Sequence, residues 1–464
     1  MKKIIITMLI LVLVAVGAAV ILPHGGKAGD PEEKSTSGSV SGTGEADGQK
    51  ADSSTNANDA DNVQDSTVNT ADGSQDGSEK LDKKDDGTSE ETGNGDIAVG
   101  ANDADSENDK KENTEDKTES DIVEKTLADM SLRDKVCQMM FVRPESITGI
   151  DVVTAAGDTT KQALEKYPVG GVVYFAQNLE SKDQVKEMIE NSQSYCKIGL
   201  FVSTDEEGGV VNRLMNTVGT TYIDSMYNYK DQGTEKAYEN ANTIATDMHE
   251  LGFNMDFAPV ADVWSNPSNT VIGERAYSDD YSQAAELVGS AVKGFEDGDI
   301  MCTLKHFPGH GDTAEDSHYS SAYVKRTKDE IMADEMQPFK SGIDAGADFV
   351  MVGHLIVPDI DELPATLSYK ITTEMLRNEM NFNGIAITDS LAMGSIADNY
   401  GVGESSVMAV KAGIDMLLDP TDIDTAVDSI VQAVESGDIT EDRIDESVRR
   451  ILTLKEKKGL LSQE

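Results

Sequence analysis

The chain has 464 residues, a formal net charge of −47 and three cysteines. An acidic excess this large argues against nucleic acid as a partner and makes docking on anionic lipid unfavourable, because both surfaces would repel the protein. Cys137, Cys196 and Cys302 are odd in number and lie in or beside apolar runs, so a disulfide framework is not expected.

The amino terminus predicts export. Residues 4–22 carry no charge and follow Met1-Lys2-Lys3, the pattern of a signal peptide or a membrane anchor. The small residues Gly17-Ala18-Ala19 offer a cleavage site, but the apolar run continues to Leu22, so a retained anchor is favoured over a cleaved signal. Residues 1–24 are therefore assigned to this segment. The remainder is expected outside the membrane, either anchored or secreted, where it could be associated with a cell wall.

Residues 25–120 form an acidic stretch rich in Ser, Thr, Asp and Gly with almost no large apolar side chain. Such a segment cannot bury enough surface to offset chain entropy. We predict a disordered linker that acts as a spacer, without catalytic residues.

Residues 121–464 alternate between short apolar runs and amphipathic helical segments, which is typical of an α/β protein with a parallel sheet. Eight strands are predicted at Val136–Met140, Gly171–Phe175, Gly199–Thr204, Met255–Val260, Met301–Lys305, Phe349–Val352, Gly384–Thr388 and Met416–Leu418. Helices are predicted at Lys182–Ser192, Thr234–Glu250, Tyr281–Gly298, Lys328–Gly346, Thr372–Glu379 and Thr440–Lys458. Eight such units fit one (β/α)8 TIM barrel, expected to be monomeric. The alternative, a doubly wound open sheet, usually has a glycine-rich turn after its first strand, and this chain has none.

Polar residues follow several predicted strands, at the end where barrel enzymes carry their chemistry. They are Asp205, Arg213, Asp262, Arg275, Lys305, His306, His354 and Asp389. An acid after a strand can also cap the next helix, so any one of them is as well explained by structure as by function. Their joint occurrence favours a site for a polyhydroxylated ligand such as a sugar.

Residues 304–318 hold three of the chain's six histidines, and Pro308, Gly309 and Gly311 predict a loop. Asp316 and His318 are spaced so that the carboxylate can fix the tautomer of the imidazole, leaving its other nitrogen to move protons. The spacing of Cys302, His306 and His310 could suggest zinc, but no fourth ligand follows, and Lys305 would place a cation beside the metal. Neither a metal nor another cofactor is expected.

Five blocks of sequence carry a resemblance to a known family. They are Lys305-His306-Phe307-Pro308-Gly309-His310-Gly311-Asp312-Thr313 with Asp316-Ser317-His318, Asp205-Glu206-Glu207-Gly208-Gly209 with Arg213, Phe257-Ala258-Pro259-Val260 with Asp262, Ile272-Gly273-Glu274-Arg275, and Ile387-Thr388-Asp389-Ser390-Leu391-Ala392-Met393. In this order, over residues 122–461, they resemble glycoside hydrolase family 3, and within it the β-N-acetylhexosaminidase branch.

The resemblance implies roles for individual residues. Asp389 matches the nucleophile that forms a covalent glycosyl-enzyme, His318 the general acid/base, and Asp316 the partner carboxylate of that histidine. The residues implied to bind the terminal N-acetylglucosamine (GlcNAc) are Asp205, Arg213, Arg275, Lys305 and His306. A neutral imidazole facing an anionic nucleophile avoids the repulsion between two carboxylates, which makes the assignment physically reasonable.

Two positions depart from the family pattern. Val210 stands where the family usually has arginine, and residues 319–323 lack its usual Leu-Pro. The first departure predicts local repacking, and the second leaves the path of the loop open.

The leading hypothesis is an exo-acting, retaining β-N-acetylglucosaminidase acting on cell-wall fragments or related glycans. Phosphorolysis remains an alternative, because a histidine acid does not repel phosphate. A β-glucosidase is disfavoured by the Asp316-Ser317-His318 element, and a non-catalytic glycan-binding protein by the presence of Asp389, Asp316 and His318. The sequence does not indicate the aglycone.

Overall fold

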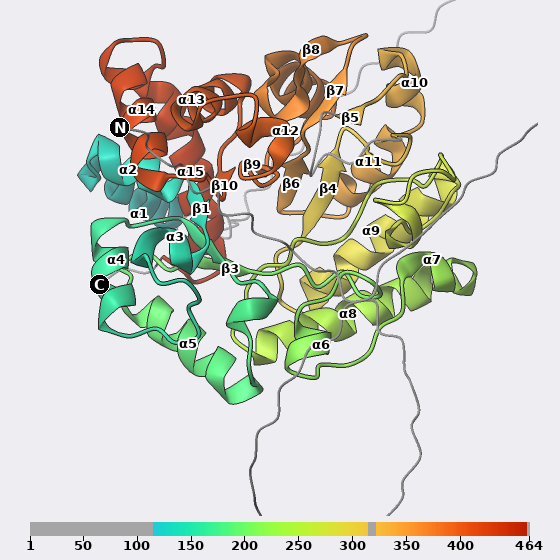
Figure 1. Cartoon of the computed structure of the whole chain (residues 1–464), viewed down its shortest axis with the longest axis horizontal. Helices are drawn as coiled ribbons and strands as arrows, with labels where there is room; N and C mark the ends of the chain where they lie inside the picture. The colour runs from blue at the N-terminus through green and yellow to red at the C-terminus, as the bar shows by residue number, and fades with distance from the viewer. Residues whose placement is uncertain (1–114, 314–321, 462–464) are drawn as a thin grey trace, which may run out of the picture. The chain divides into compact units, whose positions relative to one another are not determined.

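A computed structural model describes residues 115–313 and 322–461, coloured along the chain in Figure 1. The predicted apolar segment 1–24, the linker as far as residue 114, and Asp316 and His318 all lie outside the described residues. Within the described residues no helix is long and apolar enough to cross a membrane.

Two sheets made entirely of parallel strands lie at the centre of the fold. The first has the order β10-β1-β2-β3, formed by β1 (Met140–Val142), β2 (Gly171–Val173), β3 (Phe201–Ser203) and β10 (Leu417–Leu418). The second has the order β4-β6-β9, formed by β4 (Thr303–Phe307), β6 (Phe349–Val352) and β9 (Ile385–Thr388). All of these strand residues are buried, which explains why most of the strands are apolar runs, whereas β4 carries Lys305 and His306 of the candidate site.

Further parallel contacts involve the edges of both sheets. The segment around Met255 donates a backbone hydrogen bond to Val202 of β3, and Met255 and Val260 form isolated bridges to Met301 and Lys305. A third parallel bridge joins Ile387 of β9 to Met416, next to β10.

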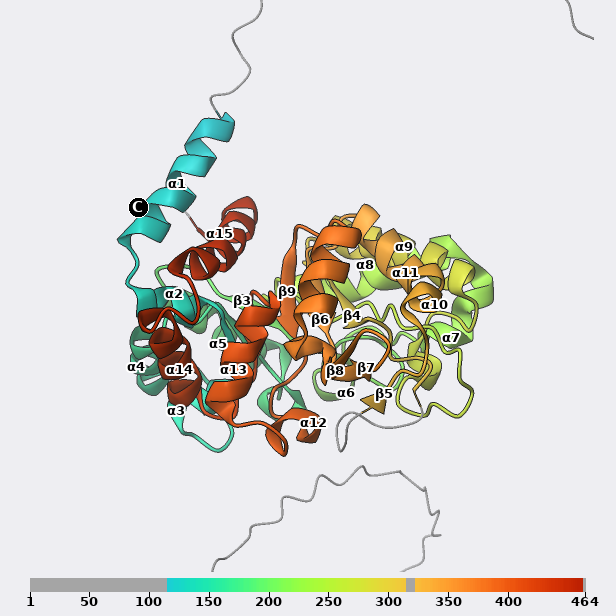
Figure 2. The same cartoon turned by 90° about the horizontal axis from the view of Figure 1, so that it is seen from above.

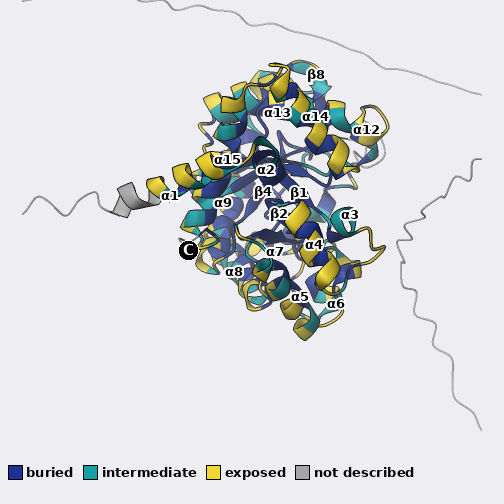
Figure 3. Ribbon diagram, turned by 90° about the vertical axis from the view of Figure 1, so that its left-hand side faces the viewer, coloured by how far each residue is buried: buried dark blue, intermediate teal, exposed yellow. Residues whose placement is uncertain are grey.

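Helices surround these strands in Figures 1 and 2. The α-helices are α1 (Glu115–Asp129), α2 (Leu132–Gln138), α3 (Pro144–Thr148), α4 (Asp158–Lys166), α5 (Lys182–Ser194), α6 (Leu214–Thr217), α7 (Met226–Tyr229), α8 (Thr234–Glu250), α9 (Tyr281–Asp297), α10 (Lys328–Ala333), α11 (Met336–Asp344), α12 (Gly394–Ala397), α13 (Val402–Ala412), α14 (Ile423–Glu435) and α15 (Glu441–Lys457). Short 3-10 turns are η1 (Ala176–Asn178), η2 (Lys230–Gln232), η3 (Gly273–Arg275) and η4 (Ala365–Leu367), and η5 (Lys370–Glu379) is a π-helix. Figure 3 shows buried residues on the strands and exposed residues on the outer helix faces.

Local chemistry accounts for several helix boundaries. The side chains of Ser181 and Thr440 accept backbone hydrogen bonds from Gln184 and Arg443, which caps α5 and α15. The amphipathic helix predicted at Thr440–Lys458 is confirmed as α15, since Ile444, Val448, Ile451 and Leu452 are fully buried. Helix α1 begins at Glu115, inside the stretch predicted to be linker, and packs beside α15.

Some predicted elements were wrong or displaced. Most of Val136–Met140 is helical, because Ser131 caps α2, and β1 begins only at Met140. Lys328–Gly346 is two helices, interrupted at Asp334 and Glu335, whose carboxylates pair with Arg326. Met255–Val260 forms only bridges. The predicted strand Met301–Lys305 is displaced to Thr303–Phe307, so His306 and Phe307, expected in the loop, belong to β4.

A third, small sheet was not predicted. It has the order β5-β7-β8, from β5 (Ala322–Tyr323), β7 (Leu355–Val357) and β8 (Asp361–Pro364), and its β7-β8 pairing is antiparallel. These strands are two to four residues long, which is too short for a periodic pattern.

Candidate active site

The predicted polar residues gather at the carboxyl ends of the parallel strands. In the second sheet, Phe307 aligns with Val352, and Val352 aligns with Thr388. Asp389 follows Thr388 directly, and its backbone N–H donates to the Val352 carbonyl over 2.9 Å. Lys305 and His306 at the end of β4 and Asp389 at the end of β9 therefore occupy the same edge of the sheet.

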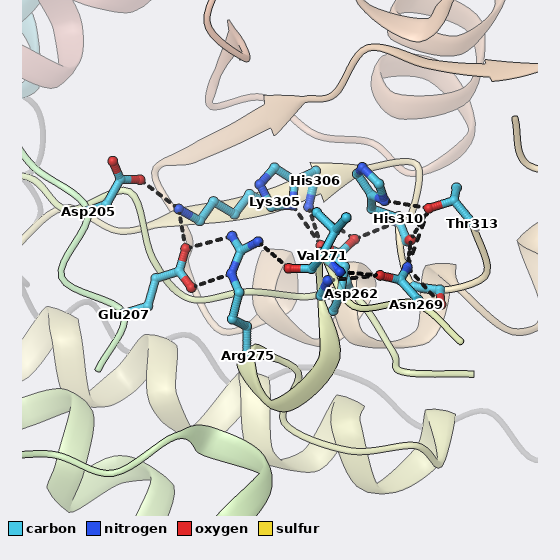
Figure 4. A network of polar contacts seen from close by, with 12 residues as sticks. Asp205, Glu207, Asp262, Asn269, Val271, Arg275, Lys305, His306, His310 and Thr313 are labelled. Atoms are coloured by element: carbon cyan, nitrogen blue, oxygen red, sulfur yellow. Dashed lines mark hydrogen bonds and ion pairs between the residues drawn. The ribbon is translucent and has the colours of Figure 1, made fainter. Parts of the chain in front are cut away.

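Glu207 is the centre of one cluster in Figure 4. Arg275 donates to both carboxylate oxygens over 2.8 Å each, and the Lys305 Nζ lies 2.6 Å from Oε1. The Glu207 side chain is fully buried. Burial alone would raise the pKa of this carboxyl, but Arg275 and Lys305 outweigh it and hold the pKa well below its ordinary value. Glu207 is therefore a permanent anion that fixes two cations.

Asp205 and Arg213 form the outer part of the same cluster. The Lys305 Nζ donates to Asp205 Oδ1 over 2.8 Å, and the Arg213 Nη2 lies 3.7 Å from Asp205 Oδ2. The Asp205 and Arg213 side chains are 18% and 30% exposed, against 2% for Lys305. Burial acts to lower the pKa of Lys305, but Asp205 and Glu207 raise it above the ordinary value, so Lys305 stays charged. The cluster offers charged donors and an acceptor to a hydroxylated ligand.

Glu206, between the two acids of that cluster, has a different task. Its carboxylate accepts the backbone N–H groups of Arg213, Leu214 and Met215 over 2.6, 2.7 and 3.0 Å, which holds the start of α6. The buried Asp256 accepts the Glu206 backbone N–H over 3.0 Å. These contacts determine the path of the chain between Asp205 and Arg213.

The turn after Glu207 requires its glycines. Gly208 and Gly209 have φ values of +89° and +57°, and a Cβ on Gly209 would lie 2.5 Å from the Ser225 Cα. Val210, where the family resemblance leads one to expect arginine, follows this turn and is 60% exposed. The substitution therefore costs no buried contact.

Asp262 is the centre of a second cluster in Figure 4. Its carboxylate lies 2.7 Å from the His306 Nδ1 and accepts the backbone N–H groups of His306 and His310 over 3.2 and 2.6 Å. The His310 Nδ1 lies 2.7 Å from the Thr313 Oγ1, and Asn269 donates to the His310 carbonyl over 2.7 Å. The first part of the predicted histidine loop is thus tightly hydrogen-bonded.

Asp389 is half-buried and close enough to influence His310. Burial lowers the pKa of the His310 ring, and the charges of Asp262 and Asp389 only partly oppose that effect. Ser390 donates its backbone N–H to Asp389 Oδ1 over 2.7 Å, and His354 donates from Nε2 to the Ser390 carbonyl over 2.8 Å. The Asp389 carboxylate therefore has a defined orientation at the strand end.

Comparisons with known proteins identify the family of the chain. Residues 131–454 match the family described as "Glycosyl hydrolase family 3 N terminal domain". The chain belongs to glycosyl hydrolase family 3.

Relatives within family 3 place the chain in the β-hexosaminidase branch. It is 31% identical over 326 residues to "Beta-hexosaminidase A" of Pseudoalteromonas piscicida, covering 64% of this chain and 54% of that protein. It is 31% identical over 340 residues to "Beta-hexosaminidase LpqI" of Mycobacterium tuberculosis, covering 70% and 83%. The chain thus spans about half of the first relative and most of the second.

A solved structure gives the same result. The glycoside hydrolase family 3 β-N-acetylglucosaminidase from Paenibacillus sp. superposes with a TM-score of 0.68 at 37% identity, covering 72% of this chain and 64% of that one. The family 3 domain of this chain therefore has the α/β fold of a known glycosidase.

The structure brings together most of the site residues that the family 3 resemblance implied. Asp205, Arg213, Arg275 and Lys305 share one cluster, while His306 belongs to the neighbouring Asp262 cluster. The ligand roles of these five residues, and the role of Asp389, stay predictions. Asp316 and His318 lie outside the described residues.

Three buried acids in or beside the family 3 motifs are missing from the site residues that the sequence predicts: Glu206, Glu207 and Asp256. A signal for Glu206 and Glu207 was present, since both lie directly before Gly208-Gly209. Among residues 115–313 and 322–461 no group of three or more His, Cys, Asp or Glu side chains could hold a metal ion. The His306 and His310 rings, which the zinc alternative needed, are engaged with Asp262 and Thr313.

Proposed function

We propose that this family 3 chain is an exo-acting, retaining β-N-acetylglucosaminidase that releases terminal GlcNAc from cell-wall fragments or related glycans. The observation that carries the proposal is the Glu207 cluster, whose Lys305 lies on β4 in the same sheet as β9. Two buried cations, Lys305 and Arg275, and the partly exposed Asp205 and Arg213 provide donors and an acceptor for sugar hydroxyls. The relatives named β-hexosaminidase support the amino sugar as substrate.

The proposed chemistry has two steps. In the first, Asp389 attacks the anomeric carbon while His318 protonates the leaving oxygen, giving a covalent glycosyl-enzyme. In the second, His318 removes a proton from water as the water hydrolyses that bond. Asp316 is proposed to stabilise the protonated imidazole. The half-buried Asp389 carboxylate, oriented by the Ser390 N–H, supports its part in this scheme.

The proposed architecture is a closed (β/α)8 barrel. Support comes from the bridges that connect the segment 255–260 to β4 and residue 416 to β9, in addition to the two parallel sheets. Closure would direct Asp205, Lys305 and Asp389 toward one mouth, as the chemistry needs.

The proposed setting is outside the cytoplasmic membrane. Support comes from the uncharged run at residues 4–22 and the acidic stretch that follows it. We propose that the first segment anchors the chain or directs its secretion, that the stretch is a spacer, and that the protein acts as a monomer without a cofactor.

Hydrolysis of a substrate panel tests the function. The purified chain is given aryl β-GlcNAc, β-GalNAc and β-glucoside with and without phosphate, and products are identified. Free GlcNAc is expected from the first substrate in both buffers. GlcNAc-1-phosphate appearing with phosphate would identify a phosphorylase, preferential cleavage of the glucoside a β-glucosidase, and binding of GlcNAc glycans without turnover a glycan-binding protein.

A further inference from the structure

Asp262 lies behind the His306 ring, on the segment that follows the bridge at Val260. Its side chain is fully buried, while the side chain of His306 is 10% exposed. Burial acts to raise the pKa of the Asp262 carboxyl, but the pKa lies below its ordinary value. The donors that favour the ionised form include the backbone N–H groups of His306 and His310, which Asp262 accepts over 3.2 and 2.6 Å. Asp262 is therefore a buried anion, and its oxygens can only accept hydrogen bonds.

A carboxylate that only accepts dictates where the His306 proton lies. The 2.7 Å contact between Asp262 Oδ2 and His306 Nδ1 requires the proton on Nδ1. In a neutral ring, Nε2 then carries the lone pair. Among residues 115–313 and 322–461 no group forms a hydrogen bond with that Nε2, so the lone pair is available to a ligand.

Three further contacts keep the ring in place. The His306 backbone N–H donates to both Asp262 oxygens over 3.2 Å, and the His310 N–H donates to Oδ1 over 2.6 Å. The His310 ring packs edge-on against the His306 ring, with centroids 5.9 Å apart. One carboxylate thus fixes the tautomer of His306 and also the backbone on both sides of Pro308.

We propose that Asp262 is a positioning residue that holds the His306 proton on Nδ1, so that Nε2 can accept a hydrogen bond from one hydroxyl of the bound sugar. The inference rests on the proposed function and adds a specificity element to its site. Lys305, Arg275 and Arg213 can only donate, and Asp205 already shares its oxygens with two of these cations. An imidazole nitrogen accepts a hydrogen bond from a hydroxyl without placing a further anion near the Asp389 nucleophile.

Tautomer measurement tests the proposal without any substrate. The full chain, which has six histidines, is labelled with 15N in histidine only, and the His306 signals are identified by their loss in His306→Ala. At pH 8, where imidazoles are ordinarily neutral, the His306 proton is expected on Nδ1. Asp262→Asn, whose amide can donate to Nδ1, is expected to move the proton to Nε2. A wild-type ring protonated on Nε2 would overturn the proposal.

Kinetics with deoxy sugars separate positioning from general damage. A deoxy substrate that lacks the hydroxyl bound by His306 should have a kcat/KM about 10-fold lower than the parent substrate with the wild type. With Asp262→Asn the same deoxy substrate should lose less than about 3-fold in kcat/KM. The double variant Asp262→Asn/His306→Ala should be no worse than His306→Ala. The matched control is Thr313→Val, which alters the same network at His310 and should keep the wild-type penalty.

The two proposals fail in different ways. An Asp262→Asn variant that loses the same factor on the parent and on every deoxy substrate would show a merely structural role and overturn the inference. A wild-type chain that cleaves no GlcNAc substrate would contradict the proposed function. The tautomer measurement would still show whether Asp262 holds the His306 proton on Nδ1.

Discussion

Two buried carboxylates, Glu207 and Asp415, are each surrounded by cations but lie at opposite ends of the strands. Asp415 precedes β10 and accepts from Arg377, from Ser447 over 2.7 Å, from Arg450 over 3.0 Å, and from the Ala386 N–H over 3.0 Å. Burial would raise its pKa, but Arg377, Arg443 and Arg450 hold it below the ordinary value.

The two clusters differ in the groups that their cations contact besides the central carboxylate. Arg377 also donates to the Phe382 and Gly384 carbonyls, and Arg443 to the Ile414 carbonyl, so the Asp415 network is directed at its own backbone. Around Glu207 the cations extend to the partly exposed Asp205. A buried ion pair alone does not indicate a ligand site. A cluster indicates one when it also includes partly exposed charged side chains, as Asp205 and Arg213 are here.

The largest expected effect comes from Asp389, the proposed nucleophile, which follows β9 in the same sheet as Lys305 of the Glu207 cluster. Asp389→Ala should lower turnover of aryl β-GlcNAc by at least about 10⁴-fold, roughly 5.5 kcal/mol in the barrier, because no other group forms the glycosyl-enzyme. Initial rates measure it, with the exposed Asp398 of the same segment as the control through Asp398→Ala. Activity near that of the wild type would remove Asp389 as nucleophile.

Asp415→Asn should affect stability and leave the chemistry alone. Removing the charge leaves Arg377 and its neighbours uncompensated, at a cost of about 3–5 kcal/mol in the free energy of unfolding. Urea unfolding measures the loss, and kcat per folded molecule should be unchanged. If Asp415→Asn instead lowered kcat tenfold and left the free energy of unfolding unchanged, the Asp415 cluster would be functional like the Glu207 cluster.

Glu207→Gln, unlike Asp415→Asn, should lower activity. Arg275 loses one charged acceptor and Lys305 becomes less firmly held, so kcat/KM should fall about 100-fold, near 3 kcal/mol. The same substitution at the exposed Glu296 is the matched control. If only the unfolding free energy changes, Glu207 belongs with Asp415 as a structural acid.

The smallest effect concerns Lys455, a buried cation with no carboxylate partner among the described residues. Its Nζ donates to Gln138 over 2.9 Å, and burial lowers its pKa to about 7. The ordinary value is near 10.5, so between these two pH values the unfolded chain binds more protons and stability rises with pH. Wild type should gain about 2 kcal/mol from pH 7 to 9.

Lys455→Met provides the comparison for that pH dependence. The variant should lack the gain and be more stable than the wild type at pH 6, as denaturant unfolding at several pH values will show. Parallel curves for the two proteins would mean that Lys455 is charged in the folded state, like Lys305.

The sequence by itself determined the elements with a strong periodic pattern and the residues that follow them. The strand Phe349–Val352 and the helix Thr234–Glu250 were predicted to the residue, and Asp389 was correctly expected at a strand end. Apolar runs and amphipathic repeats are local properties, so they survive without tertiary context. Short elements such as α2 and β5 carry too little pattern, and the apolar run Val136–Met140 predicts a strand where the structure has the end of α2.

Only the tertiary structure decided which acids do what. Glu206 and Glu207 are adjacent in sequence, yet one holds the backbone of Arg213 and the other holds Arg275, 68 residues away. Asp262 faces a histidine 44 residues further on. Burial and pairing arise between distant segments, and these contacts set both the charge of a carboxylate and its partners, so a motif names the candidates but not their tasks.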